Sequence, residues 1–236
     1  MRLLVTRPAV EAEATAEHLR SLGHAPIVCP LFIVRQLSGV TVDLNGVQAL
    51  LFTSAAGARA FAAQRSERSI PAITVGDSSA ETARALRFMS VRSAQGDGGA
   101  LVEYVRDTLD PARGALLHIT GADVIDIAAG LTAAGFEYRR SILYEAAPLT
   151  ALPQQAASAV RGGAFDGALF FSPRSASTFV RLLQRAGLTG RCRDAQAFCL
   201  SAAIAGEAAA LPWASMHTAP APNQAALLAL LPAPGS

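Results

Sequence analysis

The sequence contains no lysine, so arginine supplies all 20 of its cationic side chains. The absence of lysine excludes the phosphate-binding motif GxxxxGK[ST], and no GxGxxG segment follows an expected strand. The arginines are scattered and outnumber the 18 acidic residues by only two, so the clustered basic surface of a nucleic-acid-binding protein is also missing. We therefore expect neither a nucleotide cofactor nor a nucleic-acid partner.

Metal-binding and membrane-spanning patterns are also absent. The three cysteines, Cys29, Cys192 and Cys199, show no CxxC or CxxH spacing, and we expect buried free thiols. The four histidines are isolated, no HExxH occurs, and we expect no metal. No apolar run approaches the length of a membrane span, and the run after Met1 is too short for a signal peptide. These absences favour a cytoplasmic protein with no membrane partner.

An internal repeat is the most informative feature that is present. Four short apolar pieces occur in the first half and return in the same order in the second. The pairs are 3–7 with 116–120, 51–54 with 169–172, 73–76 with 198–201, and 91–94 with 216–219. Helical positions repeat as well, because Ala58 and Phe61 return as Ala176 and Phe179. The chain is therefore predicted to contain two copies of one module.

The module itself predicts an α/β fold. Each piece is an apolar run, then a small or polar turn, then an amphipathic stretch with helical period. Runs such as Ala49–Phe52 and Ala168–Phe171 lack polar alternation, as expected for parallel strands that helices cover on both faces. In such sheets, ligands bind beyond the carboxyl ends of the strands. The turns at those ends are rich in Ser, Thr and Gly. One of them, Gly96-Asp97-Gly98-Gly99, is either an anion cradle or a flexible turn.

The order and spacing of these turns match a known family. The matching pieces are 5–8 (VTRP), 29–31 (CPL), 52–61 (FTSAAGARAF), 75–80 (VGDSSA), 143–146 (LYEA) and 170–176 (FFSPRSA). With them the chain resembles uroporphyrinogen-III synthase over nearly all of its 236 residues. The resemblance implies two similar flavodoxin/Rossmann-like lobes with parallel sheets. Lobe 1 would comprise residues 1–35 plus 147–236, lobe 2 residues 36–146, and residues 232–236 a flexible tail.

The resemblance also implies how the lobes are connected. Two antiparallel strands, around Ile33–Gln36 and Arg140–Leu143, would join them and leave them free to open and close. The first strand would lie in the sheet that contains Phe170, not in the sheet that contains Leu51. We expect the protein to be a monomer.

The implied reaction needs neither a cofactor nor a metal. Hydroxymethylbilane, the small-molecule substrate, loses its terminal hydroxyl as water and forms an azafulvene-like carbon. The substituted carbon of ring D attacks that electrophilic carbon and gives a spiro intermediate, which fragments and closes again with ring D inverted. The enzyme must position the chain, which is worth about 7–11 kcal/mol in well-oriented systems. Tyr144 matches the family's tyrosine and would assist as a general acid; the alternative is a tyrosine packed at the hinge.

The eight carboxylates of the substrate require hydrogen-bond donors. The candidate binding residues lie at strand–helix turns, where N–H groups and the helix dipole converge. They are Thr6, Arg7, Thr53, Ser54, Gly76, Ser79, Gly121, Ser172 and Ser201. Ser or Thr at such a turn is also an ordinary helix N-cap, and only clustering would separate the two interpretations.

Two positions depart from the family pattern. Ile125 stands where an arginine is usual, so one candidate anion anchor is missing, and Ile204 stands where a threonine hydroxyl is usual. A non-catalytic two-lobed module that binds or senses a tetrapyrrole or another solute is therefore the competing hypothesis. A pair of response-regulator-like domains is disfavoured, because neither Thr6-Arg7 nor Thr53-Ser54 supplies a phosphoacceptor aspartate.

Overall fold

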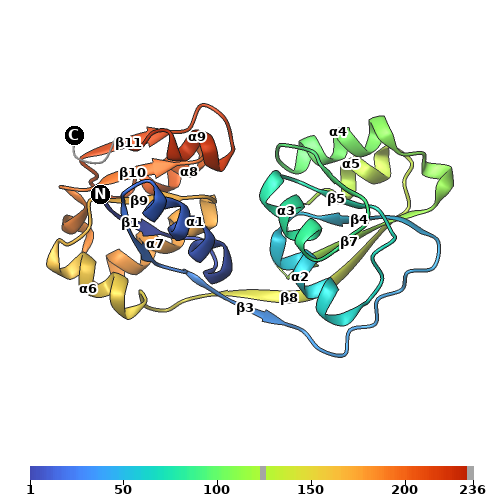
Figure 1. Cartoon of the computed structure of the whole chain (residues 1–236), viewed down its shortest axis with the longest axis horizontal. Helices are drawn as coiled ribbons and strands as arrows, with labels where there is room; N and C mark the ends of the chain where they lie inside the picture. Colours follow the sequence, from blue (N-terminus) through green and yellow to red (C-terminus); the bar gives the residue numbers. More distant parts are fainter. Residues whose placement is uncertain (123–125, 233–236) are drawn as a thin grey trace. The chain divides into compact units, whose positions relative to one another are not determined.

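The computed structural model of the protein describes residues 1–122 and 126–232. The chain folds into two compact units (Figure 1). Unit 1 combines Met1–Ile33 with Ala147–Ser236, and unit 2 is the continuous segment Val34–Ala146. Two strands contain the boundaries between the units, β3 (Phe32–Gln36) and β8 (Tyr138–Pro148). Most of the tail expected at 232–236 lies outside the described residues.

Unit 1 is built on a five-stranded sheet in the order β11-β10-β9-β1-β2. All four of its strand pairings are parallel. The strands are β1 (Arg2–Val5), β2 (Ala25–Val28), β9 (Gly167–Phe170), β10 (Gln196–Cys199) and β11 (Ser215–Thr218). As predicted for the first strand, β1 pairs with β9, and Leu3 lies opposite Gly167.

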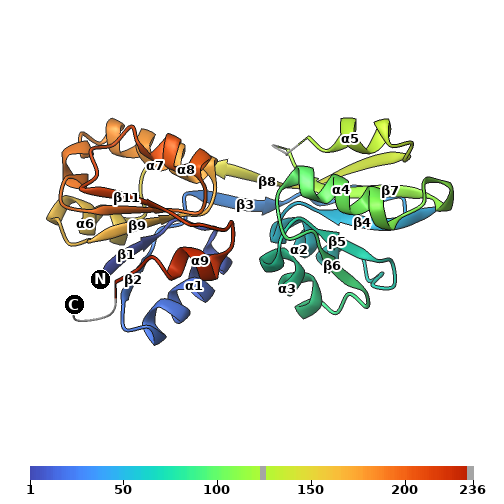
Figure 2. The same ribbon diagram turned by 90° about the horizontal axis from the view of Figure 1, so that it is seen from above.

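Helices cover both faces of the unit 1 sheet (Figure 2). From β1 the chain continues to β2 on one side of the sheet, and from β9 it continues to β10 on the other. Right-handed crossovers therefore place the connecting helices α1 and α7 on opposite faces. The helices are α1 (Ala9–Ser21), α6 (Gln154–Gly162), α7 (Pro173–Arg185), α8 (Ala202–Ala208) and α9 (Gln224–Leu228), with a short 3₁₀ turn η2 (Thr189–Cys192).

Unit 2 contains a six-stranded sheet in the order β3-β8-β7-β4-β5-β6. Its other strands are β4 (Val47–Phe52), β5 (Ala72–Thr74), β6 (Val91–Ser93) and β7 (Ala115–Gly121). The helices α2 (Ala55–Gln64) and α3 (Asp77–Ala85) pack on one face, around Phe52 and Phe61. The helices α4 (Gly98–Thr108) and α5 (Ala128–Ala133) pack on the other, around Leu51 and Leu116, and a 3₁₀ turn η1 (Pro111–Arg113) precedes β7.

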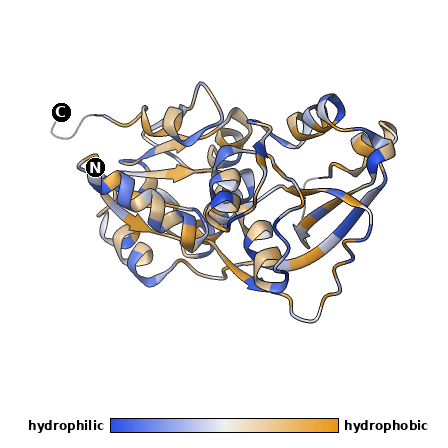
Figure 3. Cartoon of the chain, turned by 45° about the vertical axis from the view of Figure 1, so that its right-hand side comes forward, coloured by the Kyte–Doolittle hydropathy of each residue, from blue (hydrophilic) through white to orange (hydrophobic). Residues whose placement is uncertain are grey.

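The central strands have the continuous apolar character that the sequence predicted. Residues 49–52 of β4 and 167–170 of β9 are buried, and every residue of β7 is buried. Figure 3 shows the corresponding hydrophobic segments in the sheets of the chain. Parallel strands covered on both faces need no polar side, which confirms the predicted α/β class.

The sequence repeat corresponds to equivalent strands in the two sheets. Read across each sheet, β2-β1-β9-β10-β11 of unit 1 matches β8-β7-β4-β5-β6 of unit 2. The repeat pairs β1 with β7, β9 with β4, β10 with β5 and β11 with β6, and each pair holds the same place in its sheet. Unit 1 uses its strands in the flavodoxin order 2-1-3-4-5, whereas unit 2 is a circular permutation of that order.

The antiparallel connection lies further along the chain than the sequence predicted. Leu37 N–H donates to the Leu143 carbonyl at 2.8 Å, and Leu149 N–H donates to the Leu31 carbonyl at 2.9 Å, so β3 and the second half of β8 run in opposite directions. The expected segment Arg140–Leu143 lies largely in the first half of β8, where residues 138–142 pair in parallel with β7. A single 11-residue strand therefore serves both as a sheet strand and as the connection.

Candidate functional site

The predicted site residues follow the carboxyl ends of the parallel strands in each unit. In unit 1 the chain leaves the neighbouring strands β1 and β9 toward opposite sides of the sheet, through Thr6-Arg7 and Ser172. In unit 2 it leaves β7 and β4 in the same way, through Gly121 and Thr53-Ser54. These are the points where an α/β sheet reverses its strand order and where ligands bind. Each unit therefore presents one candidate site.

In unit 2, Ser54 and Tyr144 form the shortest side-chain contact of the site. Their hydroxyl oxygens are 2.7 Å apart. Ser54 is the N-cap of α2, and its oxygen accepts a hydrogen bond from Gly57 N–H at 3.2 Å. Because that oxygen already accepts one bond, Ser54 is well placed to donate its own hydrogen to Tyr144. The phenol then keeps its proton for another acceptor.

Tyr144 is held in place by the backbone of the neighbouring strand. It is 8% exposed, and its Cα pairs with that of Gly121, next to an irregularity where β8 has one residue more than β7. A Cβ added to Gly121 would lie 2.7 Å from Cε2 of Tyr144, so only glycine lets the ring approach this closely. Tyr144 is thus both packed, as one sequence hypothesis stated, and hydrogen-bonded to a predicted site residue.

Thr53 contacts a histidine that the sequence analysis set aside as isolated. Its hydroxyl lies 3.0 Å from Nε2 of His118, and Nδ1 of His118 lies 2.8 Å from the Tyr138 hydroxyl. His118 is fully buried in the middle of β7. Burial, with a smaller contribution from the charge of Arg140, lowers its pKa from 6.5 to about 4. A polar residue inside the apolar run ALLHIT was the sequence signal that could have revealed it.

Arg140 is a second residue that the sequence analysis did not assign to the site. From β8, its guanidinium donates to the carbonyls of Gly121 and Ala122, at 3.2 and 3.0 Å. It therefore brings a positive charge to the turn that follows β7. The departure at Ile125 lies outside the described residues.

In unit 1, Thr6 and Arg7 have partners within the unit. Thr6 is fully buried, and its hydroxyl donates to the Leu169 carbonyl at 2.7 Å, which ties β1 to β9. Arg7 donates to Oε1 of Gln224 at 2.6 Å and lies 4.5 Å above the ring of Phe171. The turn after β1 is therefore fixed to α9 and to the end of β9.

The three predicted serines at helix starts are all N-caps. Ser54, Ser172 and Ser201 accept hydrogen bonds from Gly57, Ser175 and Ile204 N–H, respectively. Each leaves further N–H groups of its helix for a ligand. At α3 the N-cap is Gly76, which has no side chain to fill that place, and Ser79 follows in the first turn. The start of α4 is different, because the Asp97 carboxylate accepts from Ala100 N–H and already supplies a negative charge.

Neither a nucleophilic cysteine nor a metal site is supported by the described residues. Burial raises the pKa of Cys29 and Cys192 to about 12 and that of Cys199 to about 11, so the buried free thiols are predicted correctly and are not nucleophiles. Among residues 1–122 and 126–232, no group of three or more His, Cys, Asp or Glu side chains could hold a metal ion. No helix in this described part is long and apolar enough to cross a membrane.

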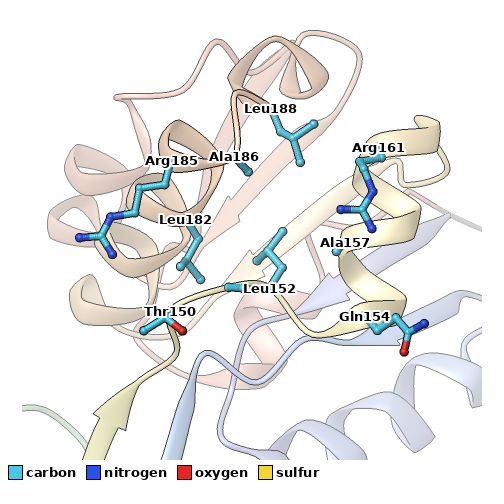
Figure 4. A pocket seen from close by; sticks show the side chains of 10 residues that line it. Thr150, Leu152, Gln154, Ala157, Arg161, Leu182, Arg185, Ala186 and Leu188 are labelled. Atoms are coloured by element: carbon cyan, nitrogen blue, oxygen red, sulfur yellow. The ribbon is translucent and has the colours of Figure 1, made fainter.

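A pocket of about 440 Å³ in unit 1 lies away from the strand-end turns (Figure 4). It is lined by the segment before α6, which includes Leu152, by α6 with Arg161, and by the carboxyl-terminal part of α7 with Leu182 and Arg185. Because α7 begins at the carboxyl end of β9, its last turns lie toward the opposite edge of the sheet. In Figure 4 the two arginines project from different helices and do not converge. The pocket is therefore not part of the candidate site.

Comparison with known proteins identifies the family. The family model described as Uroporphyrinogen-III synthase HemD matches residues 13–229. The chain belongs to the uroporphyrinogen-III synthase family. Uroporphyrinogen-III synthase is a hydro-lyase of tetrapyrrole biosynthesis that converts hydroxymethylbilane to uroporphyrinogen III, and this is the activity of the chain.

Solved structures of uroporphyrinogen-III synthases share the fold. The uroporphyrinogen-III synthetase of Helicobacter pylori is 16% identical, with a TM-score of 0.62 over 98% of both chains. A mutant uroporphyrinogen III synthase from the extremely thermophilic bacterium Thermus thermophilus is 14% identical, with a TM-score of 0.54 over 92% of both chains. No curated protein matches the chain significantly. At such low identity the fold is shared, while the side chains of the site must be argued from this chain itself.

Proposed function

We propose that Tyr144 is the general acid of the uroporphyrinogen-III synthase reaction and that Ser54 orients it. The observation that carries the proposal is the 2.7 Å contact between the two hydroxyls at the carboxyl end of β4. Ser54 donates to the phenol oxygen, and the phenol donates to the terminal hydroxyl of hydroxymethylbilane. The bond from Ser54 also stabilises the negative charge that develops on the phenol oxygen as the proton leaves.

Tyr144 both gives a proton at the start of the reaction and recovers one at its end. Tyr144 gives its proton to the leaving hydroxyl, which departs as water while the pyrrole nitrogen lone pair forms the azafulvene. Attack at the substituted carbon of ring D gives the spiro intermediate, which fragments and closes at the free α-carbon of ring D. That carbon loses its proton, and the tyrosine recovers one. No oxidant or reductant is consumed.

The substrate carboxylates are held by the strand-end turns of each unit. In unit 2 the donors are the N-terminal N–H groups of α2 and α3, together with Thr53, Ser79 and the positive charge of Arg140. In unit 1 they are the N-terminal N–H groups of α7 and α8, beside Ser172 and Ser201, with Arg7 and the backbone of Thr6 at the end of β1. Helix N-termini favour anions through their free N–H groups and the helix dipole.

The experiment that tests the proposal is conversion of hydroxymethylbilane, followed by oxidation and separation of the porphyrin isomers. The purified protein should form the type III isomer without added cofactor and in the presence of a chelator. Spontaneous closure gives the type I isomer, which a heat-inactivated sample measures as the background. Binding of the tetrapyrrole with only type I product would favour the non-catalytic binding module instead.

We further propose that the protein acts as a monomer in the cytoplasm, which the family membership supports. Light scattering coupled to size-exclusion chromatography should give a mass close to 24.4 kDa. A mass of twice this value at micromolar concentration would contradict the monomer. Fractionation of cells should find the protein with the cytoplasmic markers.

A further inference from the structure

A fully buried histidine on the central strand of unit 2 links two hydroxyl groups. His118 lies on the face of β7 that also carries Leu116, and its partners come from the two neighbouring strands. Thr53, one residue beyond the end of β4, lies 3.0 Å from Nε2, and Tyr138 of β8 lies 2.8 Å from Nδ1. Burial of an imidazole without partners is costly, so these two bonds account for how it is accommodated. They do not explain why a series of hydrogen bonds, from Tyr138 through His118, ends at the candidate binding residue Thr53.

The charge state of His118 restricts the possible arrangements to two. Burial and the charge of Arg140 keep the ring neutral, so one nitrogen donates and the other accepts. In the first arrangement, Nε2–H donates to Thr53 and the Tyr138 hydroxyl donates to Nδ1. In the second, the Thr53 hydroxyl donates to Nε2 and Nδ1–H donates to Tyr138.

Only the first arrangement leaves Thr53 able to bind an anion. There its oxygen accepts from His118, and its hydrogen is free to point into the turn after β4. In the second arrangement that hydrogen is directed at His118, and only lone pairs face the turn, which repel a carboxylate. Tyr138 can act as the required donor, because burial raises its pKa and keeps the phenol protonated.

We propose that His118 is a positioning residue that donates from Nε2 to Thr53 and so presents the Thr53 hydroxyl to a substrate carboxylate. This inference rests on the proposed function, since it assigns Thr53 to the binding of hydroxymethylbilane. Tyr138 donates to Nδ1 on the other side of the imidazole ring and so holds His118 in this tautomer. His118 itself does not touch the substrate.

Steady-state kinetics of hydroxymethylbilane conversion test the role. The His118→Leu variant should raise KM about 10-fold and change kcat little, because a hydrogen bond to a charged group is lost from ground state and transition state alike. His118→Gln, whose amide can donate to Thr53, should recover most of the loss. The double variant His118→Leu/Thr53→Val should be no worse than Thr53→Val alone, because both changes remove the same contact. Additive losses, or a normal KM in His118→Leu, would overturn the inference.

Nitrogen NMR gives a second readout that does not depend on turnover. In wild-type protein saturated with uroporphyrin III, His118 should be protonated on Nε2, and His118→Gln identifies its signal among the four histidines. Protonation on Nδ1 in this complex would contradict the proposal. If His118→Leu does not fold, Tyr138→Phe keeps the imidazole and removes the donor to Nδ1. This variant should raise KM by a smaller factor. An unchanged KM would count against the proposed hydrogen-bond series from Tyr138 through His118 to Thr53.

The two proposals can fail separately. If the wild-type protein makes no type III isomer, the proposed function fails, while weaker binding of uroporphyrin III to His118→Leu than to wild type still supports the positioning role. If the wild type is active and the His118 variants keep its KM, only the positioning role fails. Thermal unfolding of each variant separates both outcomes from a loss of folded protein.

Discussion

Tyr144 is the residue for which packing and chemistry make different predictions. Replacement by Phe removes one oxygen and leaves the packed ring against Gly121, so we expect thermal stability to change little. The rate of type III formation should fall by less than about 100-fold, because an electron-rich pyrrole expels the hydroxyl with little assistance from an acid. Stopped-time assays with isomer separation measure the rate.

A matched control for this substitution lies on the same unit. Tyr104 belongs to α4, on the face opposite to α2, and Tyr104→Phe should leave the rate of type III formation unchanged. Full activity in Tyr144→Phe would remove Tyr144 from the mechanism. Failure of that variant to fold would instead assign the tyrosine to packing.

His118 should also make the stability of unit 2 depend on pH. Its pKa is lowered to about 4 in the folded protein, mainly by burial, whereas the unfolded chain titrates at the usual 6.5. Between these values the unfolded state binds a proton that the folded state does not, so stability is full above about pH 6.5 and falls as the pH is lowered. The loss at pH 4 is on the order of 3 kcal/mol.

Urea unfolding of wild type and His118→Gln between pH 4 and 8 measures this dependence. The free energy of unfolding of the wild type should fall more steeply below pH 6.5 than that of the variant. His24, whose pKa is also lowered by burial, is present in both proteins and cancels in the difference. Parallel curves would show that His118 is protonated at no free-energy cost in the folded state.

The sequence predicted which turns follow the strands but not the partners of their side chains. Thr6 and Thr53 both follow a strand. The Thr6 hydroxyl donates to the Leu169 carbonyl inside the sheet, whereas the Thr53 hydroxyl contacts His118. Both partners are distant in the chain and are set by strand pairing, which short-range patterns do not report. For the same reason Ser54 and Tyr144 could each be predicted from the sequence as candidate site residues, but the bond between them could not be foreseen.

At the scale of elements, helix α2 can lie close to the sheet because its first turn contains Gly57. A Cβ at this position would lie 2.7 Å from the carbonyl oxygen of Ile119, a backbone atom of β7 that cannot move aside easily. Gly57→Ala should therefore destabilise the protein by about 1–3 kcal/mol. It should also lower activity, because α2 carries the Ser54 cap that contacts Tyr144. Urea unfolding and the isomer assay measure the two effects.

Gly206 provides the control for that substitution. It lies in α8, and nothing in the described structure is within 4 Å of a Cβ added there. Gly206→Ala should increase stability by about 0.5–1 kcal/mol, because alanine loses less backbone entropy in a helix. Equal effects of the two substitutions would argue against the close approach of α2 to β7.

The elements themselves were predictable where the apolar pattern was long and repeated. Each of the eight repeated pieces overlaps a strand, and the repeated helical positions are buried, Ala58 and Phe61 in α2 and Ala176 and Phe179 in α7. The connection was harder to place, because β8 has one continuous pattern while its two halves pair with different strands, β7 and β3. Pairing partners of this kind are decided by the topology and not by local sequence.

At the scale of the whole molecule, the two units differ in how the chain builds them. We propose that they are two domains and that the continuous one, Val34–Ala146, folds alone. It contains all strands of its sheet except the first two residues of β3 and the last two of β8, and it keeps its cores on both faces. A fragment of residues 34–146 should show cooperative thermal unfolding and dispersed NMR signals.

The discontinuous unit supplies the control for this prediction. A fragment of residues 1–33 contains β1 and β2 but lacks β9, and it should remain unfolded. A fragment 34–146 without cooperative unfolding would show that the units need each other to fold. In the intact protein, two separate transitions are then expected wherever the stabilities of the units differ.

The pairing of β1 with β9 also has a consequence during protein synthesis. Leu3, Leu4 and Val5 are completely buried in the finished sheet, but β9 begins only at Gly167. At the usual speed of a ribosome, β1 waits on the order of ten seconds for β9, although its other neighbour, β2, follows it directly. Unit 2 emerges and can fold during that interval, while the apolar amino terminus stays exposed to the cell. Strand β1 therefore stays incompletely paired during most of synthesis, and it is the strand that a nascent-chain chaperone has most reason to protect.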